Sequence, residues 1–300
     1  MPTISLIAKP GGLDPALAEV VRNACGGGDL VWLAPDEAAE FEVPEAPSNL
    51  GDLQAEVDRL GVDMNLVAPE RRRAAILLAD MDSTMIGQEC IDELADMAGV
   101  GEAVRAVTAR AMNGELEFEE ALRERVAQLR GLPERTIEEV LRARIRLAPG
   151  GPVLLATMSC AGAWCGLVSG GFTAFSKPVA ERLGFDGHRA NVLLAEGGVL
   201  TGEVAEPILG REAKVETLEA IARELGLGPE RALAVGDGAN DLGMIGRAGL
   251  GVALHAKPSV QEAAPIRINH GDLTALLYLQ GFTREDFVVP AGADDPRVLR

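Results

Sequence analysis

The chain has 300 residues, 47% of them hydrophobic, and its 46 acidic residues outnumber 28 basic ones to give a formal net charge of −18. Such acidity argues against sequence-independent binding to nucleic acid and against docking on anionic membranes, because both need clustered cationic side chains. No apolar run approaches the roughly 20 residues of a membrane span, and the N-terminus lacks a signal-peptide pattern, so we expect a cytoplasmic protein.

Residues 1–72 predict a compact α+β domain. Strands are expected at 3–8, 29–34, 39–44 and 62–68, and helices at 14–28 and 49–61. Asp14 as N-cap and Pro15 in the first turn favour a helix start at that point. The order β-α-β-β-α-β is that of a ferredoxin-like unit. The basic stretch at 70–74 is expected to be a solvated linker.

Residues 73–287 predict a second domain, an α/β fold with a doubly wound, mostly parallel sheet. The apolar run at 76–79 indicates a parallel strand that is buried on both faces. Later strands are expected at 163–171, within 231–241, at 250–254 and at 266–270, and helices at 152–162, 211–226 and 258–264. Residues 189–207 predict short antiparallel strands with a hairpin at Glu196-Gly-Gly198. This alternation of strands and helices is typical of a doubly wound sheet.

The region at about 88–148 has helical character only. Helices are expected at 90–99, 101–114, 117–131 and 133–145, each separated by Gly or Pro. We therefore expect a small helical bundle inserted after the first strand of the sheet, as a cap. The final residues, 288–300, are expected to form a loose tail.

Polar residues collect at four places where a strand ends or a helix begins, which is where an open α/β sheet builds its site. These places hold Asp80 and Asp82, then Ser169-Gly170-Gly171, then Lys214, and finally Asp237, Asn240 and Asp241. Two carboxylates separated by one residue point the same way from an extended chain. Adjacent glycines let backbone N–H groups approach an anion closely. Each segment alone is typical of an ordinary turn, cap or helix, but their order indicates one site.

The motifs "DMDST", "VSGG", a helix-borne lysine and "GDGANDLGM" resemble those of the haloacid dehalogenase-like phosphohydrolases. The resemblance covers about residues 74–282. Three stretches, "DMDSTMIGQECIDELA", "AMNGELEFEEALRERVAQLRGL" and "LVSGGF", resemble the phosphoserine phosphatases in particular. The N-terminal domain is similar in topology to the ACT-like extension that some of these enzymes carry.

Phosphate-ester chemistry and the resemblance assign the same roles to the two aspartates of the first motif. Asp80 would attack phosphorus and form an aspartyl-phosphate, while Asp82 would protonate the leaving oxygen and later deprotonate a water. The resemblance further implies Mg²⁺, which favours hard oxygen ligands, held by the carboxylates of Asp80 and Asp237 and the backbone carbonyl of Asp82.

The resemblance also implies which residues hold the substrate. The phosphoryl oxygens would be held by Ser169, Gly170, Gly171 and Lys214, with Asn240 supporting the phosphate and Asp241 orienting Lys214. For the amino-acid end, Glu89 would bind the ammonium and Arg125 the carboxylate, with Met112 and Phe118 as an apolar wall. Glu89 and Arg125 could instead be surface charges of their helices. The hairpin near "LTGEV" would close with the cap and exclude water.

The implied function is that of an Mg²⁺-dependent phosphoserine phosphatase, which hydrolyses O-phosphoserine to serine and phosphate as the last step of serine biosynthesis. One alternative is a phosphotransferase, or a phosphatase acting on another small phosphomonoester such as phosphohomoserine. Another is a non-enzymatic amino-acid sensor. As partners, a homodimer and an amino-acid effector at the N-terminal domain stay open.

Overall fold

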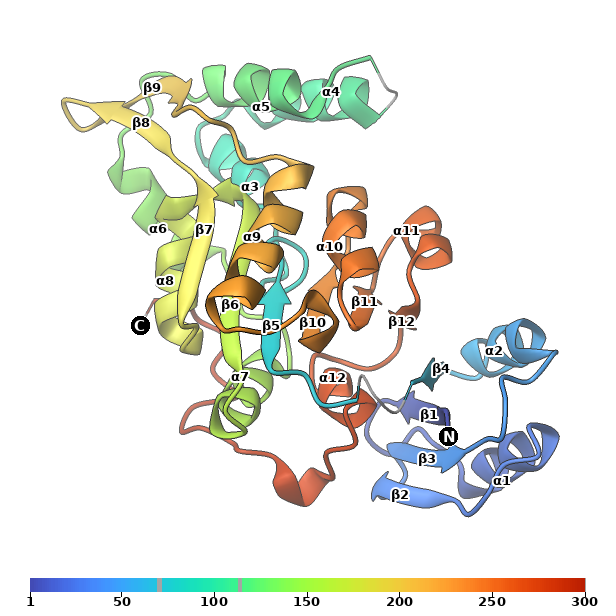
Figure 1. Cartoon of the computed structure of the whole chain (residues 1–300). Coiled ribbons are helices and arrows are strands. Elements are labelled where there is room, and N and C mark those ends of the chain that lie inside the picture. Colours follow the sequence, from blue (N-terminus) through green and yellow to red (C-terminus); the bar gives the residue numbers. More distant parts are fainter. Residues whose placement is uncertain (69–71, 113–114, 300) are drawn as a thin grey trace.

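The computed structural model describes residues 1–68, 72–112 and 115–299 and contains three sheets (Figure 1). A four-stranded sheet lies in the N-terminal unit, a six-stranded sheet forms the centre, and a two-stranded hairpin lies beside the helices at the top of the view. Within the described ranges, no helix is long and apolar enough to cross a membrane.

The N-terminal unit has the predicted β-α-β-β-α-β order. Its elements are β1 (Thr3–Ala8), α1 (Pro15–Ala24), β2 (Val31–Ala34), β3 (Ala38–Glu42), α2 (Leu50–Asp58) and β4 (Val62–Val67). The sheet order β2-β3-β1-β4, with antiparallel neighbours, is ferredoxin-like. Helix α1 begins where predicted, because the Asp14 side chain accepts a hydrogen bond from Ala16 N at 2.8 Å.

The central sheet is parallel throughout. Its strands are β5 (Ile76–Ala79), β6 (Trp164–Phe172), β7 (Gly187–Asn191), β10 (Ala232–Gly236), β11 (Leu250–Leu254) and β12 (Ile266–Ile268), in the order β12-β11-β10-β5-β6-β7. Leu77 and Ala79 of the central strand β5 face one apolar cluster, and Ile76 and Leu78 face another. This alternation explains the continuous apolar run, since both faces of the strand are covered.

Helices cover both faces of the central sheet. One face carries α7 (Gly151–Cys160), α8 (Thr173–Leu183) and α12 (Ala275–Leu279), and the other carries α9 (Arg211–Glu224) and α10 (Leu242–Arg247). Helix α11 (Pro258–Ala263) packs beside β11. The doubly wound α/β architecture is therefore confirmed, whereas α8, α10 and α12 were not predicted.

One prediction about the strands needs correction. Residues 189–191, expected in an antiparallel pair, belong to β7, which pairs in parallel with β6 at the sheet edge. The predicted hairpin itself is present, formed by β8 (Leu193–Glu196) and β9 (Val199–Val204). The error arose because β7 and the hairpin follow each other with almost no intervening loop.

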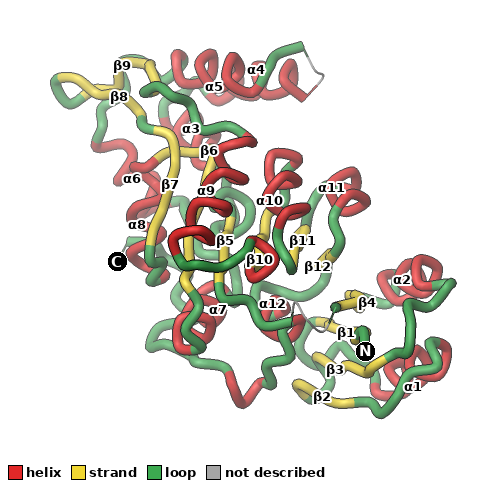
Figure 2. Tube along the Cα trace, viewed as in Figure 1, coloured by secondary structure: helices red, strands yellow, loops and turns green. Residues whose placement is uncertain are grey.

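The cap helices follow β5. They are α3 (Cys90–Met97), α4 (Gly101–Met112), α5 (Phe118–Ala127) and α6 (Arg135–Ala143). Backbone contacts join the two ends of the inserted cap. Ile86 forms a β-bridge with Leu147, and Ala148 N donates to Met85 O at 2.9 Å. Figure 2 shows α4 and α5 beyond the end of the sheet, with α5 next to the β8–β9 hairpin. Leu200 of β9 exchanges backbone hydrogen bonds of 2.8 Å with 131–132, so the hairpin is tied to the cap.

The N-terminal unit docks on β12, the edge strand of the central sheet. The Asn65 side chain of β4 accepts a hydrogen bond from Arg267 N at 3.0 Å and donates one to Arg267 O at 2.9 Å. This pair of hydrogen bonds resembles the pair that a neighbouring β-strand would form. An edge strand offers unpaired backbone groups, and this contact covers them.

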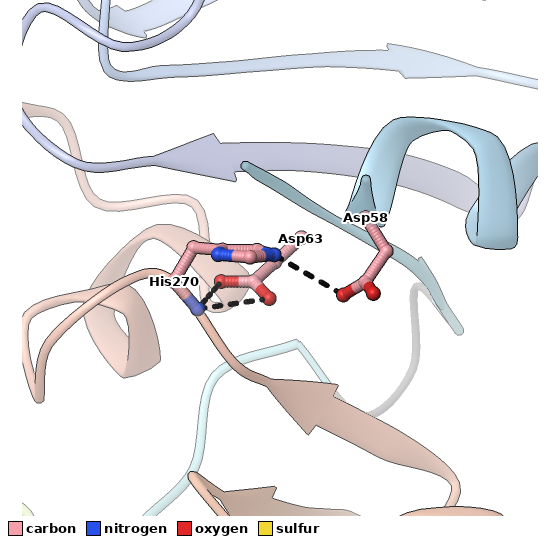
Figure 3. A group of neighbouring side chains, drawn as sticks. All are labelled: Asp58, Asp63 and His270. Carbon is pink, nitrogen blue, oxygen red and sulfur yellow. Dashed lines mark hydrogen bonds and ion pairs between the residues drawn. The ribbon is translucent and has the colours of Figure 1, made fainter. Parts of the chain in front are cut away.

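A carboxylate cluster completes this docking (Figure 3). Asp63 of β4, which is 3% exposed, accepts backbone hydrogen bonds from Asn269, His270 and Gly271 at 2.6, 3.0 and 2.8 Å. His270 Nε2 lies 3.1 Å from Asp58 Oδ1. The three side chains are near enough to share a cation. Because the polar atoms of these side chains already form hydrogen bonds, the cluster serves as a structural contact between the two units, called here the Asp63 clasp.

Arg72 and Arg73 correct the expectation of a solvated linker. Arg72 forms an ion pair with Glu40 of β3. The Arg73 guanidinium lies 3.6 Å from the centroid of the Phe282 ring, in the part of the chain that follows the central sheet. These two arginines therefore join the N-terminal unit to the rest of the chain. Glu70 and Arg71 lie outside the described residues.

The C-terminal segment is also more closely packed than expected. Leu147 N donates to Pro296 O at 2.7 Å, and Val298 is only 3% exposed within the main apolar cluster. The segment has little regular structure, but its end is held against the base of the cap, so the description as a loose tail is wrong there.

Candidate active site

A cavity of about 290 Å³ lies between the carboxyl ends of the central strands and the cap. The predicted site residues that line it are Asp80, Asp82, Glu89, Phe118, Arg125, Ser169, Gly170, Gly171, Asp237 and Asn240. Lys214 and Asp241 are buried behind this lining and contact Asp80 or one another. The side chain of Met112, the last residue of α4, lies outside what the structure describes.

Asp80 follows β5 directly and is held in a buried charge network. Its backbone N–H bonds to Val235 O of β10 at 3.0 Å, which fixes where the side chain leaves the sheet. Lys214 Nζ lies 2.8 Å from Asp80 Oδ1 and 2.5 Å from Asp241 Oδ1. Asp241 Oδ2 accepts from Gly238 N at 3.0 Å.

Burial is unfavourable for the charged side chains of this network and shifts their pKa values. Burial and the neighbouring Asp241 raise the pKa of Asp80 well above its usual range, although Lys214 works in the other direction. Burial alone would lower the pKa of Lys214, but Asp80 and Asp241 outweigh it, so that pKa is raised. Lys214 therefore stays cationic and offsets part of the repulsion between the two carboxylates.

Asp82 is half-buried and has a different environment from Asp80. Its Oδ1 accepts a hydrogen bond from Cys90 N at the start of α3, at 3.3 Å. Burial and then Glu89 raise the pKa of Asp82 to about 7, against the lowering effect of Cys90. A carboxyl group with a pKa near neutrality can both donate and accept a proton under physiological conditions.

Asp237 sits at the carboxyl end of β10 and accepts a hydrogen bond from Thr84 Oγ1 at 3.3 Å. Burial, followed by Asp241 and Glu89, raises the pKa of Asp237 to about 6. The carboxylate oxygens of Asp80, Asp237 and Asp241 lie within 4.8 Å of one another. Crowded hard oxygens that repel each other fit a divalent cation. Lys214 and Gly238 contact both carboxylate oxygens of Asp241, whereas Lys214 contacts only Oδ1 of Asp80, so Asp80 and Asp237 are the better metal donors.

The end of β6 forms a tightly packed corner of the cavity. Ser169 is 2% exposed, and its Oγ accepts a hydrogen bond from Gly171 N at 2.8 Å. A Cβ on Gly171 would lie 2.8 Å from Asp82 Oδ2 and 3.0 Å from Ser169 Oγ, so any other residue there would displace one of these side chains. Asn191 Nδ2 holds the Gly170 carbonyl at 2.9 Å. The backbone of this corner can thus approach a bound anion closely.

Glu89 and Arg125 line the cavity rather than projecting away from it. Ser83 Oγ donates to Glu89 Oε1 at 2.7 Å, and Arg125 Nε donates to Ala121 O at 3.3 Å. Burial lowers the pKa of Arg125, and the nearby carboxylates of Asp92 and Glu89 oppose that effect. An acid and a guanidinium in the lining of one cavity suit a ligand with an ammonium and a carboxylate.

Sequence reasoning missed several residues of the site. Thr84 donates to Asp237 and Cys90 N donates to Asp82; both residues lie in stretches that carried the resemblance, but no role was predicted for either. The apolar lining also includes Ile91, Leu122 and Phe172. Lys257 lines the cavity as well, and it lies between the strand predicted at 250–254 and the helix predicted at 258–264, directly before that helix. The rule that strand ends carry the site could therefore have found Lys257.

Comparisons with known proteins agree with this geometry. A family model described as haloacid dehalogenase-like hydrolase matches residues 77–245. A phosphoserine phosphatase of Polaromonas sp. strain JS666 is 44% identical over 226 residues, which are 73% of this chain and 96% of that protein. One from Streptomyces coelicolor is 43% identical over 84% of this chain, which spans 62% of that longer protein.

A solved structure is similar over almost the entire chain. The unliganded crystal structure of a probable phosphoserine phosphatase from Vibrio cholerae superposes with a TM-score of 0.78 at 31% sequence identity. The match covers 95% of this chain and 88% of that one, so it includes the N-terminal unit.

Proposed function

This chain belongs to the haloacid dehalogenase-like hydrolases, and we propose that it is a phosphoserine phosphatase, which hydrolyses O-phosphoserine to serine and phosphate. One observation carries the proposal. A single cavity is lined by Asp80 and Asp82 from the sheet and by Glu89 and Arg125 from the cap. The first pair suits phosphoryl transfer, and the second suits an amino-acid substrate.

In the first step, an Asp80 oxygen attacks phosphorus and the bond from phosphorus to the serine oxygen breaks. The leaving oxygen takes a proton from Asp82, which gives serine and an aspartyl-phosphate on Asp80. This step needs Asp82 protonated, and its pKa of about 7 supports that state near neutral pH.

In the second step, a water attacks the phosphorus of the aspartyl-phosphate and breaks its bond to Asp80. Asp82, now ionised, takes a proton from this water, so phosphate leaves and both aspartates return to their starting states. One group serves as acid and then as base because the second step reverses the proton demand of the first.

The acidic cluster supports a divalent cation, and we assign Mg²⁺ to it. Asp80 and Asp237 would supply carboxylate oxygens, and Asp82 its backbone carbonyl. When bound, such an ion neutralises phosphoryl oxygens and offsets the repulsion among the carboxylates.

The remaining site residues have proposed binding roles. The phosphoryl oxygens are held by Ser169, Gly170, Gly171 and Lys214, with Asn240 supporting the phosphate and Asp241 orienting Lys214. Glu89 binds the substrate ammonium and Arg125 its carboxylate, while Phe118 supplies apolar wall. The same wall role for Met112 stays a prediction. The hairpin, tied to the cap, moves with it to exclude water.

The chain is proposed to divide into an ACT-like N-terminal domain at 1–72 and a phosphatase core at 73–287, with the cap at about 88–148. The β-α-β-β-α-β order supports the first assignment. A homodimer and an amino-acid effector at this domain stay predictions, and we assign the enzyme to the cytoplasm.

A substrate panel tests the proposal. Purified protein should release phosphate from O-phosphoserine much faster than from phosphohomoserine or p-nitrophenyl phosphate, and EDTA should stop the reaction. Asp80→Asn should abolish turnover, whereas Asp29→Asn, at an exposed position outside the site, should not. Full activity in Asp80→Asn would exclude Asp80 as nucleophile. Phosphate transfer to added homoserine, faster than hydrolysis, would favour a phosphotransferase instead.

A further inference from the structure

Lys257 is an exposed residue that lines the catalytic cavity and that the proposed mechanism does not use. The chain has four lysines, Lys9, Lys177, Lys214 and Lys257, and two of them lie at this cavity. An exposed side chain in the lining of a cavity lies at its mouth, so Lys257 meets a ligand as that ligand enters.

The backbone of Lys257 is firmly placed. It is the N-cap of α11, with φ −63° and ψ 150°, and Pro258 fixes the first turn of the helix. Its carbonyl accepts hydrogen bonds from Val260 N at 2.9 Å and Gln261 N at 3.0 Å. The ammonium group can therefore move only as far as its own side chain reaches from a fixed point.

The position of Lys257 lies on the phosphate side of the cavity. Strand β11, which ends at Leu254, pairs in parallel with β10, and β10 leads into Asp237 and Asn240. Since the carboxyl ends of neighbouring parallel strands lie at the same edge, Lys257 leaves the sheet beside the loop proposed for the cation and phosphate.

The other cations near the cavity already face carboxylates. Lys214 contacts Asp80 and Asp241, and Arg125 lies in the field of Asp92 and Glu89. Lys257, by contrast, has no carboxylate within ion-pair distance among the residues that the structure describes. Its charge is therefore available to an anion from solution.

The cavity needs such a charge. Its lining includes four carboxylates, from Asp80, Asp82, Glu89 and Asp237, in a chain whose formal net charge is −18. O-Phosphoserine carries a phosphate that is close to a dianion at neutral pH. Long-range repulsion would slow its approach unless a cation at the mouth acted against it.

We propose that Lys257 is a substrate-positioning residue that captures the phosphate group at the cavity mouth and speeds its entry. The inference rests on the proposed phosphatase function for its substrate, and on the geometry alone for its anion site. A unit charge acting on a dianion across about 8 Å of water changes binding about five-fold. Screening at about 0.15 M salt reduces this to about two-fold.

The test compares Lys257→Gln with Lys177→Gln, which removes the same charge from the exposed face of α8, away from the cavity. For Lys257→Gln, kcat/KM should fall about three-fold at about 0.02 M salt and about two-fold at about 0.15 M, with kcat nearly unchanged. Lys257→Arg should restore it. An equal kcat/KM in the two glutamine variants, or a loss independent of salt, would overturn the proposal.

Binding of inorganic phosphate to the Mg²⁺-loaded protein, measured by calorimetry, separates the two hypotheses. If the wild type does not hydrolyse O-phosphoserine, the proposed function fails, but Lys257→Gln should still weaken phosphate binding about three-fold at about 0.02 M salt. If hydrolysis is normal and phosphate binds both glutamine variants equally, the role of Lys257 fails and the function stands.

Discussion

When a chelator has removed divalent cations, the free energy of unfolding of this protein should fall as the pH rises from about 5 to about 8. The carboxyl groups of Asp82 and Asp237 determine the direction of this change. In the folded state the pKa of Asp82 is raised from 3.8 to about 7, and that of Asp237 from 3.8 to about 6, in both cases mainly by burial. Between the ordinary and the raised value, the folded chain binds more protons than the unfolded chain. The free energy of unfolding therefore falls as the pH increases through this window.

The size of the effect follows from the shifts. Each pH unit over which one extra proton is bound corresponds to about 1.4 kcal/mol. From pH 5, Asp82 stays protonated for about two units and Asp237 for about one, which gives losses of about 3 and about 1 kcal/mol. Asp80 acts in the same direction, since its pKa is also raised. For a chain of this length, about 4 kcal/mol corresponds to about 6 °C in Tm.

Thermal unfolding followed by circular dichroism tests this reasoning at a series of pH values. With EDTA, Tm should fall by about 6 °C from pH 5 to pH 8, while Mg²⁺ should flatten the curve by binding the ionised carboxylates. Asp237→Asn should reduce the slope in EDTA, and Glu216→Gln, at an exposed position of α9, should not. A Tm in EDTA that is constant or rises over this range would refute the argument.

Two further predictions concern recognition and docking. Arg125→Ala should lower kcat/KM for O-phosphoserine by about 10²-fold while changing that for p-nitrophenyl phosphate less than about three-fold, because only O-phosphoserine has a carboxylate for Arg125 to bind. Equal losses for the two substrates in parallel assays would refute the assignment. Asp63→Ala should lower the free energy of unfolding by about 3 kcal/mol and leave kcat unchanged, since three backbone N–H groups lose their acceptor. Urea unfolding beside Glu56→Ala, an exposed control on α2, measures the second effect, and identical midpoints would contradict it.

The sequence predicted the central sheet and the position of the site because both depend on local pattern. The run at 76–79 is apolar at every position since β5 is covered on both faces, and Asp80 follows at the carboxyl end of the strand, where the cavity begins. The loop after β10 carries its polar residues for the same reason. A strand boundary and a change from apolar to charged residues are visible in a single sequence.

Elements without such a pattern were missed. Helix α8 contains Pro178, which argues against a helix interior, and β7 is an edge strand whose first residues are polar and solvent-facing. Neither element shows the continuous apolar run that marks a central strand. Both were therefore left out or joined to the hairpin that follows, although β7 completes the sheet beside β6.

Contacts between distant segments could not be predicted at all. Three consecutive arginines are most simply solvated, yet Arg73 stacks on Phe282 and donates to Gly281 O at 3.2 Å. In the same way, Asp63 is one acidic residue in a strand whose pattern says only that it is partly polar. Its partners are the backbone N–H groups at 269–271, which have no sequence signature.

The clasp around Asp63 gives the N-terminal unit an architectural role that does not depend on any effector. β12 has three residues and forms one edge of the central sheet, and the backbone that follows it would otherwise expose unpaired N–H groups. Burying a carboxylate is costly, and burial does raise the pKa of Asp63, but three N–H donors offset that cost. A mobile regulatory arm would not need a buried charge at its contact surface. The unit therefore acts first as part of the folded body of the enzyme, and any regulation by this domain has to operate through a fixed interface.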